Sequence, residues 1–91
     1  MDFSGKRVPS LTMVDYSDMT LPMVVVYNKP SDFPNMVVAR IWDGAWNKPT
    51  DVYCVYQSIT ECREDSVAAG FSICIPRSPQ DDKCIVGSYM R

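Results

Sequence analysis

The residues best suited to chemistry in this 91-residue chain are its four cysteines and eleven carboxylates, because the sequence contains no histidine. Without histidine, the Ser-His-Asp and Cys-His arrangements of nucleophilic catalysis are excluded within a single chain. The four glycines lack the spacing of a phosphate-binding loop, and the acidic residues lack the pattern of a calcium-binding EF-hand. A carboxylate pair, a thiolate or a lysine remains for catalysis.

The cysteines are single and widely spaced along the chain, at Cys54, Cys62, Cys74 and Cys84. Structural zinc sites usually draw on closely spaced Cys or His pairs, which this sequence lacks. Disulfides need an oxidising compartment, for which we find no sequence signal. We therefore expect the cysteines to be small apolar core residues and predict neither a metal site nor a cofactor.

Two features leave catalysis open. Asp43 and Asp51 flank one predicted loop and could share a metal or act as an acid/base pair, but turn chemistry explains both. Cys62 lies near the start of a predicted helix, where the helix dipole would lower its thiol pKa. It shares a stripe with Ile59, Ser66 and Ala69 that we expect to pack on the sheet, so a core position is the stronger interpretation.

A set of aromatic residues and one arginine points to recognition of another protein instead. Arg40 shares a predicted strand face with Met36, Val38 and Trp42, although an arginine whose stem packs at a rim would explain it as well. Arginine and aromatic residues are enriched at protein interfaces. The candidate interface residues are Arg40, Trp42, Trp46, Tyr53 and Tyr89.

The best-defined folding unit is a helix between two strands. Ser58 can cap the helix, Glu61 can reach back to the Ser58 N–H, and Gly70 can end it. Phe71, Ile73 and Ile75 then alternate with polar or small residues, the pattern of a half-buried strand. The 13 residues from Ser58 to Gly70 suffice for a helical crossover between parallel strands.

Other strands are predicted before and after this unit. Met23–Tyr27 is apolar throughout and should lie centrally in the sheet. The sequence predicts strands at residues 23–27, 36–42, 52–57, 71–75 and 84–90, and we expect the last to run antiparallel to the one before it. This β-β-β-α-β-β order indicates an α+β domain, with a small mixed or antiparallel sheet of four to five strands and one helix on one face.

Residues 1–22 are expected to be an N-terminal extension, either mobile or forming an edge strand or arm, ahead of an α+β domain at 23–91. The near-repeat of Asn28–Asp32 in Asn47–Asp51 is interpreted as turn chemistry used twice. Gly87 is expected to mark a bulge or a close approach within the last strand.

The overall charge and the length of the apolar stretches limit the kinds of partner that we expect. A net charge of -2 argues against an electrostatic nucleic-acid binder, since the nine basic residues are scattered. The longest apolar stretch, Met23–Tyr27, is too short to cross a membrane. We see no targeting signal and expect a cytoplasmic protein with no membrane partner.

The functional inference comes from the two faces of the sheet. One helix of about eleven residues, roughly 16 Å long, covers only part of one face, yet the strands carry apolar residues on both. The N-terminal segment, a second copy or another protein must cover the rest. We expect a small non-catalytic interaction or regulatory module that binds another protein or a second copy of itself, for example as a homodimer. The alternative is an enzyme or accessory subunit using carboxylate or cysteine chemistry with a metal or small ligand.

Overall fold

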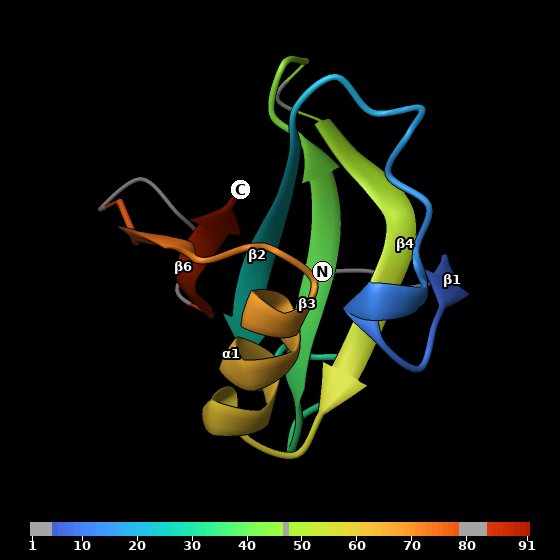
Figure 1. Cartoon of the computed structure of the whole chain (residues 1–91). Helices are drawn as coiled ribbons and strands as arrows, with labels where there is room; N and C mark the ends of the chain where they lie inside the picture. Colours follow the sequence, from blue (N-terminus) through green and yellow to red (C-terminus); the bar gives the residue numbers. More distant parts are fainter. Residues whose placement is uncertain (1–4, 47, 79–83) are drawn as a thin grey trace.

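A computed structural model describes residues 5–46, 48–78 and 84–91 and shows one helix packed against one mixed sheet (Figure 1). The sheet has six strands in the order β1-β4-β3-β2-β6-β5. The elements are β1 (Lys6–Arg7), the short 3-10 helix η1 (Leu11–Met13), β2 (Pro22–Asn28), β3 (Val37–Asp43), β4 (Lys48–Tyr56), α1 (Ile59–Ala68), β5 (Ile73–Pro76) and β6 (Ile85–Met90).

The predicted α+β class is confirmed, and the predicted count of four to five strands is wrong. The additional strand is β1, whose two residues are too few to show any alternation in the sequence. It pairs parallel with β4, and every other pairing in the sheet is antiparallel. The mixed character of the sheet therefore depends on β1 alone.

The central strand and the last hairpin were predicted correctly. β2 lies between β3 and β6, and its residues from Val24 to Tyr27 are all buried. β6 runs antiparallel to β5. These pairings make β4 and β5 run in the same direction, but β3, β2 and β6 separate them in the sheet, so α1 joins parallel strands that are not neighbours.

The residues that begin and end α1 are those predicted from the sequence, with one difference in a hydrogen bond. The Ser58 hydroxyl accepts from the Glu61 N–H at 3.1 Å, as an N-cap does. The Glu61 carboxylate accepts from the Gln57 N–H at 3.0 Å, one residue earlier than predicted. Gly70 adopts φ +93°, a conformation that favours glycine, and the helix ends just before it at Ala68.

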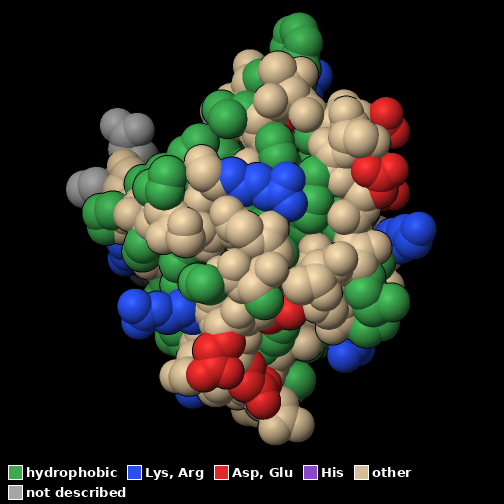
Figure 2. All heavy atoms as spheres, viewed as in Figure 1, with side chains coloured by type: hydrophobic (Ala, Val, Ile, Leu, Met, Phe, Trp, Pro, Cys, Tyr) green, Lys and Arg blue, Asp and Glu red, His purple; other side chains and the backbone are tan. Residues whose placement is uncertain are grey.

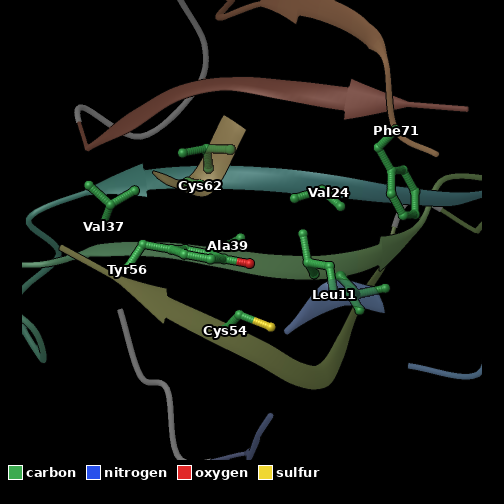
Figure 3. Close-up of a cluster of buried hydrophobic side chains, with 10 residues drawn as sticks. Leu11, Val24, Val37, Ala39, Cys54, Tyr56, Cys62 and Phe71 are labelled. Carbon is green, nitrogen blue, oxygen red and sulfur yellow. The ribbon is translucent and has the colours of Figure 1, made fainter. Parts of the chain in front are cut away.

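The main core lies between the sheet and α1. Figure 3 shows its side chains converging from the strands, the helix and η1, with Leu11, Cys54, Cys62 and Phe71 fully buried. Ser66 is also fully buried on α1, where its hydroxyl donates to the Cys62 carbonyl at 2.7 Å. The predicted helix stripe is therefore correct at Cys62 and Ser66, whereas Ile59, at its start, is 42% exposed beyond the sheet contact.

The other sheet face carries a smaller cluster, formed by Val25, Tyr27, Val38 and Tyr53. No helix covers it among the described residues. Part of its cover comes from the β2–β3 connection, where the Phe33 ring lies 6.1 Å from the Tyr53 ring. The N-terminal segment packs on the opposite, helix side, through Leu11 and Tyr16.

The second copy of the repeated turn sequence is not a turn. Asn47 lies outside the described residues, but Lys48, Pro49, Thr50 and Asp51 form the start of β4. The strand begins early because side chains bridge a register shift against β3: the Thr50 hydroxyl donates to the Ile41 carbonyl at 2.7 Å. Pro49 is tolerated because β1 pairs only with the later residues Val52 and Tyr53, which leaves the outer side of β4 open at Pro49.

Candidate interaction surface

The last two strands project beyond the cover of the helix. In Figure 1, α1 lies in front of β2 and β3, while β5 and β6 extend to its left. Strand β5 is the edge of the sheet, and all four of its residues are exposed. Figure 2 shows hydrophobic side chains gathered on this side of the molecule. An edge strand presents unpaired backbone N–H and C=O groups, so β5 is a template for pairing with another strand.

The predicted alternation of buried and exposed side chains in β5 is wrong. Phe71 is fully buried in the main core, but the strand begins only at Ile73, so the expected alternation from Phe71 is broken. Ile73 and Ile75 face away from α1 and are 54% and 37% exposed. The reason is that Phe71 caps the core where the chain leaves α1, and the chain then turns outward to reach the sheet edge.

A continuous apolar row crosses four strands on the face opposite α1. Trp42 on β3 lies opposite Met23 on β2, Met23 opposite Met90 on β6, and Met90 opposite Ile73 on β5. Direct cross-strand neighbours have Cβ atoms about 5 Å apart, so these side chains form one strip. We call these four residues the apolar row; it ends at the exposed Ile73.

Strands β5 and β6 together form a two-stranded ribbon. A hollow of about 190 Å³ lies on the helix side of this β5–β6 ribbon, next to the start of α1. Ile59 and Cys74 line it, together with Val26, Val86, Gly87, Ser88 and Tyr89. Cys74 is exposed there, which contradicts its expected place in the core. Cys84 is half-buried, so the core prediction is correct only for Cys54 and Cys62. The ribbon is thus apolar on both faces.

The structure places three of the five candidate interface residues on the face opposite α1. The Arg40 Nε donates to the Thr50 carbonyl at 2.7 Å, beside the register shift between β3 and β4. Tyr53 is buried and lies directly opposite Arg40. Trp42 is half-buried at the start of the apolar row, and its indole N–H, although buried, has no hydrogen-bond partner among the described residues.

The other two candidates lie apart from this group. Trp46 is 70% exposed in the connection between β3 and β4. Tyr89 lies on the helix side, opposite Cys74, where partial burial raises its pKa. The residues missed by sequence reasoning are Met23, Met90 and Ile73. Their apolar character was visible in the sequence, but the strand order that aligns them was not.

The two carboxylates considered for catalysis have separate surroundings. The Asp43 carboxylate accepts from the N–H groups of Thr20, Leu21 and Ala45 at 3.1 to 3.3 Å. Desolvation alone would raise its pKa, but these hydrogen bonds together hold the pKa below its ordinary value. Asp51 is exposed on β4. Asp43 therefore ties the segment before β2 to the β3–β4 turn.

The buried thiols are poorly suited to act as nucleophiles. Burial raises the pKa of Cys54 to about 11 and that of Cys62 to about 12. The thiolate is the reactive form, and very little of it exists at neutral pH with such values. Among the described residues, no three Cys, Asp or Glu side chains are grouped so that they could hold a metal ion.

Comparison with protein-family models, curated proteins and solved structures gave no match for this chain. Within the part of the chain that the structure describes, no helix combines the length and apolar character needed to cross a membrane.

Proposed function

We propose that this protein is a small non-catalytic interaction module that associates with a second copy of itself through β5. The observation that carries the proposal is the position of β5: it is an edge strand, wholly exposed, beyond the reach of α1. Natural proteins usually protect such edges with charges, bulges or covering segments. The residues of β5 are Ile73, Cys74, Ile75 and Pro76: none is charged, and the proline that could protect the edge stands only at the end of this short strand.

A second copy fits this edge because antiparallel pairing of a strand with itself is isologous. A two-fold axis perpendicular to the sheet brings β5 beside β5 of the partner, so each copy gives and receives the same contacts. The same axis also keeps equivalent faces of the two sheets on the same side. The apolar rows of both copies then lie on one side of a continuous sheet, and Ile73 and Ile75 meet their counterparts.

Pairing of the four β5 residues alone would bury too little surface to hold two copies together. A stable interface buries roughly 800 Å² per partner, which is about a seventh of this chain's surface of 5489 Å². Burial of the exposed side chains around the ribbon must contribute, with Ile73 and Ile75 on the face opposite α1 and Val86, which is 40% exposed, at the hollow on the helix side. The proposal therefore predicts strong sensitivity to charge at Ile73.

The test is the molar mass in solution, measured by light scattering after size exclusion at several micromolar concentrations with reductant. We expect the wild-type protein to approach twice the mass of one chain as concentration rises, and Ile73→Lys to remain monomeric. Val67→Lys is the matched control, because Val67 on α1 is 51% exposed against 54% for Ile73. A monomeric wild type, or equal effects of both variants, would overturn the proposal.

A further inference from the structure

The segment between β1 and β2, residues 8–21, crosses the helix side of the sheet, and we call it the strap. It packs beside α1 and contributes Leu11 to the main core, with Val8, Val14, Tyr16 and Met19 around it. In Figure 1 its helical turn η1 lies in front of β4. It thus completes the cover that α1 alone does not provide.

Among the described residues, backbone hydrogen bonds attach the strap to the sheet and its β3–β4 turn only at the two ends of the strap. The Val8 N–H donates to the Tyr53 carbonyl at 2.9 Å, and the Gly44 N–H donates to the Leu21 carbonyl at 2.8 Å. Between them, the backbone hydrogen bonds of the strap's described residues are local, as from Met13 to Ser10 and from Met19 to Tyr16. The middle of the strap must be held by side chains.

One carboxylate supplies the hydrogen bonds that join residues 9–19 to the rest of the described chain. The Ser10 hydroxyl donates to Asp65 Oδ1 at 2.6 Å, and the Leu11 N–H donates to Asp65 Oδ2 at 2.9 Å. From the sheet, the Tyr56 hydroxyl donates to the same Oδ2 atom. Asp65 therefore links α1, β4 and the strap at one point, and hydrogen bonds to a charged group are the stronger ones.

The remaining attachment is apolar and aromatic. The Tyr16 ring lies edge-on to Phe71 at 5.2 Å, and the Arg91 guanidinium lies 4.4 Å above the Tyr16 ring. Under the strap, Figure 3 shows the Cys54 sulfur directed toward η1 and Leu11, whereas Cys62 lies away from them on α1. The strap thus covers one buried thiol and leaves the other to α1 and the sheet.

We propose that the strap is a lid, which opens as a unit while α1 and the sheet stay folded, and that Asp65 is the latch that keeps it closed. Segments with few backbone hydrogen bonds to their surroundings open locally at lower free energy than the whole domain unfolds. Opening withdraws Leu11 and uncovers an apolar floor containing the Cys54 thiol. This device is independent of pairing through β5.

The test follows the alkylation of each cysteine by mass spectrometry in the full chain. Asp65→Asn removes the charged acceptor, and Ser10→Ala removes one donor while keeping the charge. Asp15→Asn is the matched control, because the Asp15 carboxylate accepts from Ser17 within the strap itself. Cys62 serves as the internal reference, since it becomes exposed only when α1 leaves the sheet.

We expect Asp65→Asn to accelerate alkylation of Cys54 by on the order of tenfold or more, with a smaller increase for Ser10→Ala. Urea should accelerate alkylation of Cys62 more steeply than that of Cys54, because exposing Cys62 uncovers more of the chain, and Asp15→Asn should change neither rate. If the alkylation rates of Cys54 and Cys62 depend equally on urea, both thiols become exposed only when the whole domain unfolds and there is no separate lid. Unchanged rates in both latch variants would equally overturn the proposal.

Discussion

The Tyr56 hydroxyl on β4 donates a hydrogen bond to the Asp65 carboxylate on α1, and the same carboxylate accepts from the strap. This one acceptor joins three segments that are distant in the sequence. Its partner is affected as well: burial, followed by the hydrogen bond to Asp65, raises the pKa of Tyr56. The tyrosine therefore stays protonated and remains a donor at neutral pH.

Acid should weaken the contribution of Asp65 to stability. Desolvation alone would raise its pKa, but the hydrogen bonds from Ser10, Tyr56 and Leu11 hold it below the ordinary value of 3.8. A lowered folded-state pKa gives stability that is present above pH 3.8 and is lost as pH falls through the folded value. The titratable groups around Asp65 are Tyr16, Cys54, Tyr56, Glu61, Cys62 and Glu64. Of the cations next to this group, Arg91 lies over the Tyr16 ring and Arg7 interacts with Cys54.

The measurement is urea unfolding at a series of pH values for wild type and Asp65→Asn. The difference in unfolding free energy between the two proteins gives the contribution of Asp65 alone. Asp15 and Asp43, whose pKa values are also lowered, contribute equally to both proteins and cancel. We expect a difference of about 1–3 kcal/mol near pH 7, from the lost hydrogen bonds to a charged group. The difference should shrink below pH 3.8. A constant difference across this range would contradict the assignment.

Leu11 should be a major stabilising residue despite its position outside the strands and α1. It is fully buried, whereas Met13, two residues later in the same turn, is 69% exposed. Truncation of a buried leucine leaves a cavity, so we expect Leu11→Ala to cost roughly 2–5 kcal/mol in chemical denaturation. Met13→Ala is the control and should cost less than about 0.5 kcal/mol. Similar costs for both would mean that the strap does not complete the core.

Gly87 should be required for the shape of the β5–β6 ribbon. It has φ +158°, lies opposite Pro76, and adjoins a register shift against β2, as expected for a bulge. A Cβ at this position would stand 2.9 Å from the Ile75 carbonyl oxygen, which belongs to the backbone and cannot move aside easily. We therefore expect Gly87→Ala to cost about 1–3 kcal/mol.

Hydrogen exchange of the β5 and β6 amides would locate this effect. Gly87→Ala should speed exchange in the ribbon more than in β3, because the clash lies between β5 and β6. Ser88→Ala, at the next position, is the control and should leave exchange in the ribbon near the wild-type rate. Uniform acceleration throughout the sheet would show that the damage is not local.

Several sequence predictions were confirmed for clear physical reasons. The Ser58 cap and Gly70 stop were correct because helix ends are fixed by local hydrogen bonds and by the conformational freedom of glycine. The central position of β2 was correct because a run of apolar residues on both faces needs cover on both. The predicted alternation after Phe71 was wrong because Phe71 is buried in the main core, and the chain then turns outward before β5 begins.

The candidate interface was assembled from residue types, and the strand order separated it. Tyr89 and Tyr53 lie on opposite sides of the sheet, and Trp46 lies in a turn beyond the strands. Whether the named residues form an interface stays a prediction, as does the division of the chain at residue 22. The structure adds Met23, Met90 and Ile73, because neighbouring strands bring them into one row.

The sequence by itself determined the class of the domain, the ends of its helix and the burial of its central strand, since each depends on interactions between residues close along the chain. Only the tertiary structure decided that β5 lies at the edge, that the apolar row is continuous, and that Asp65 reaches Ser10. These relationships join residues far apart in the sequence. They depend on strand order and packing, which no local pattern of side chains specifies.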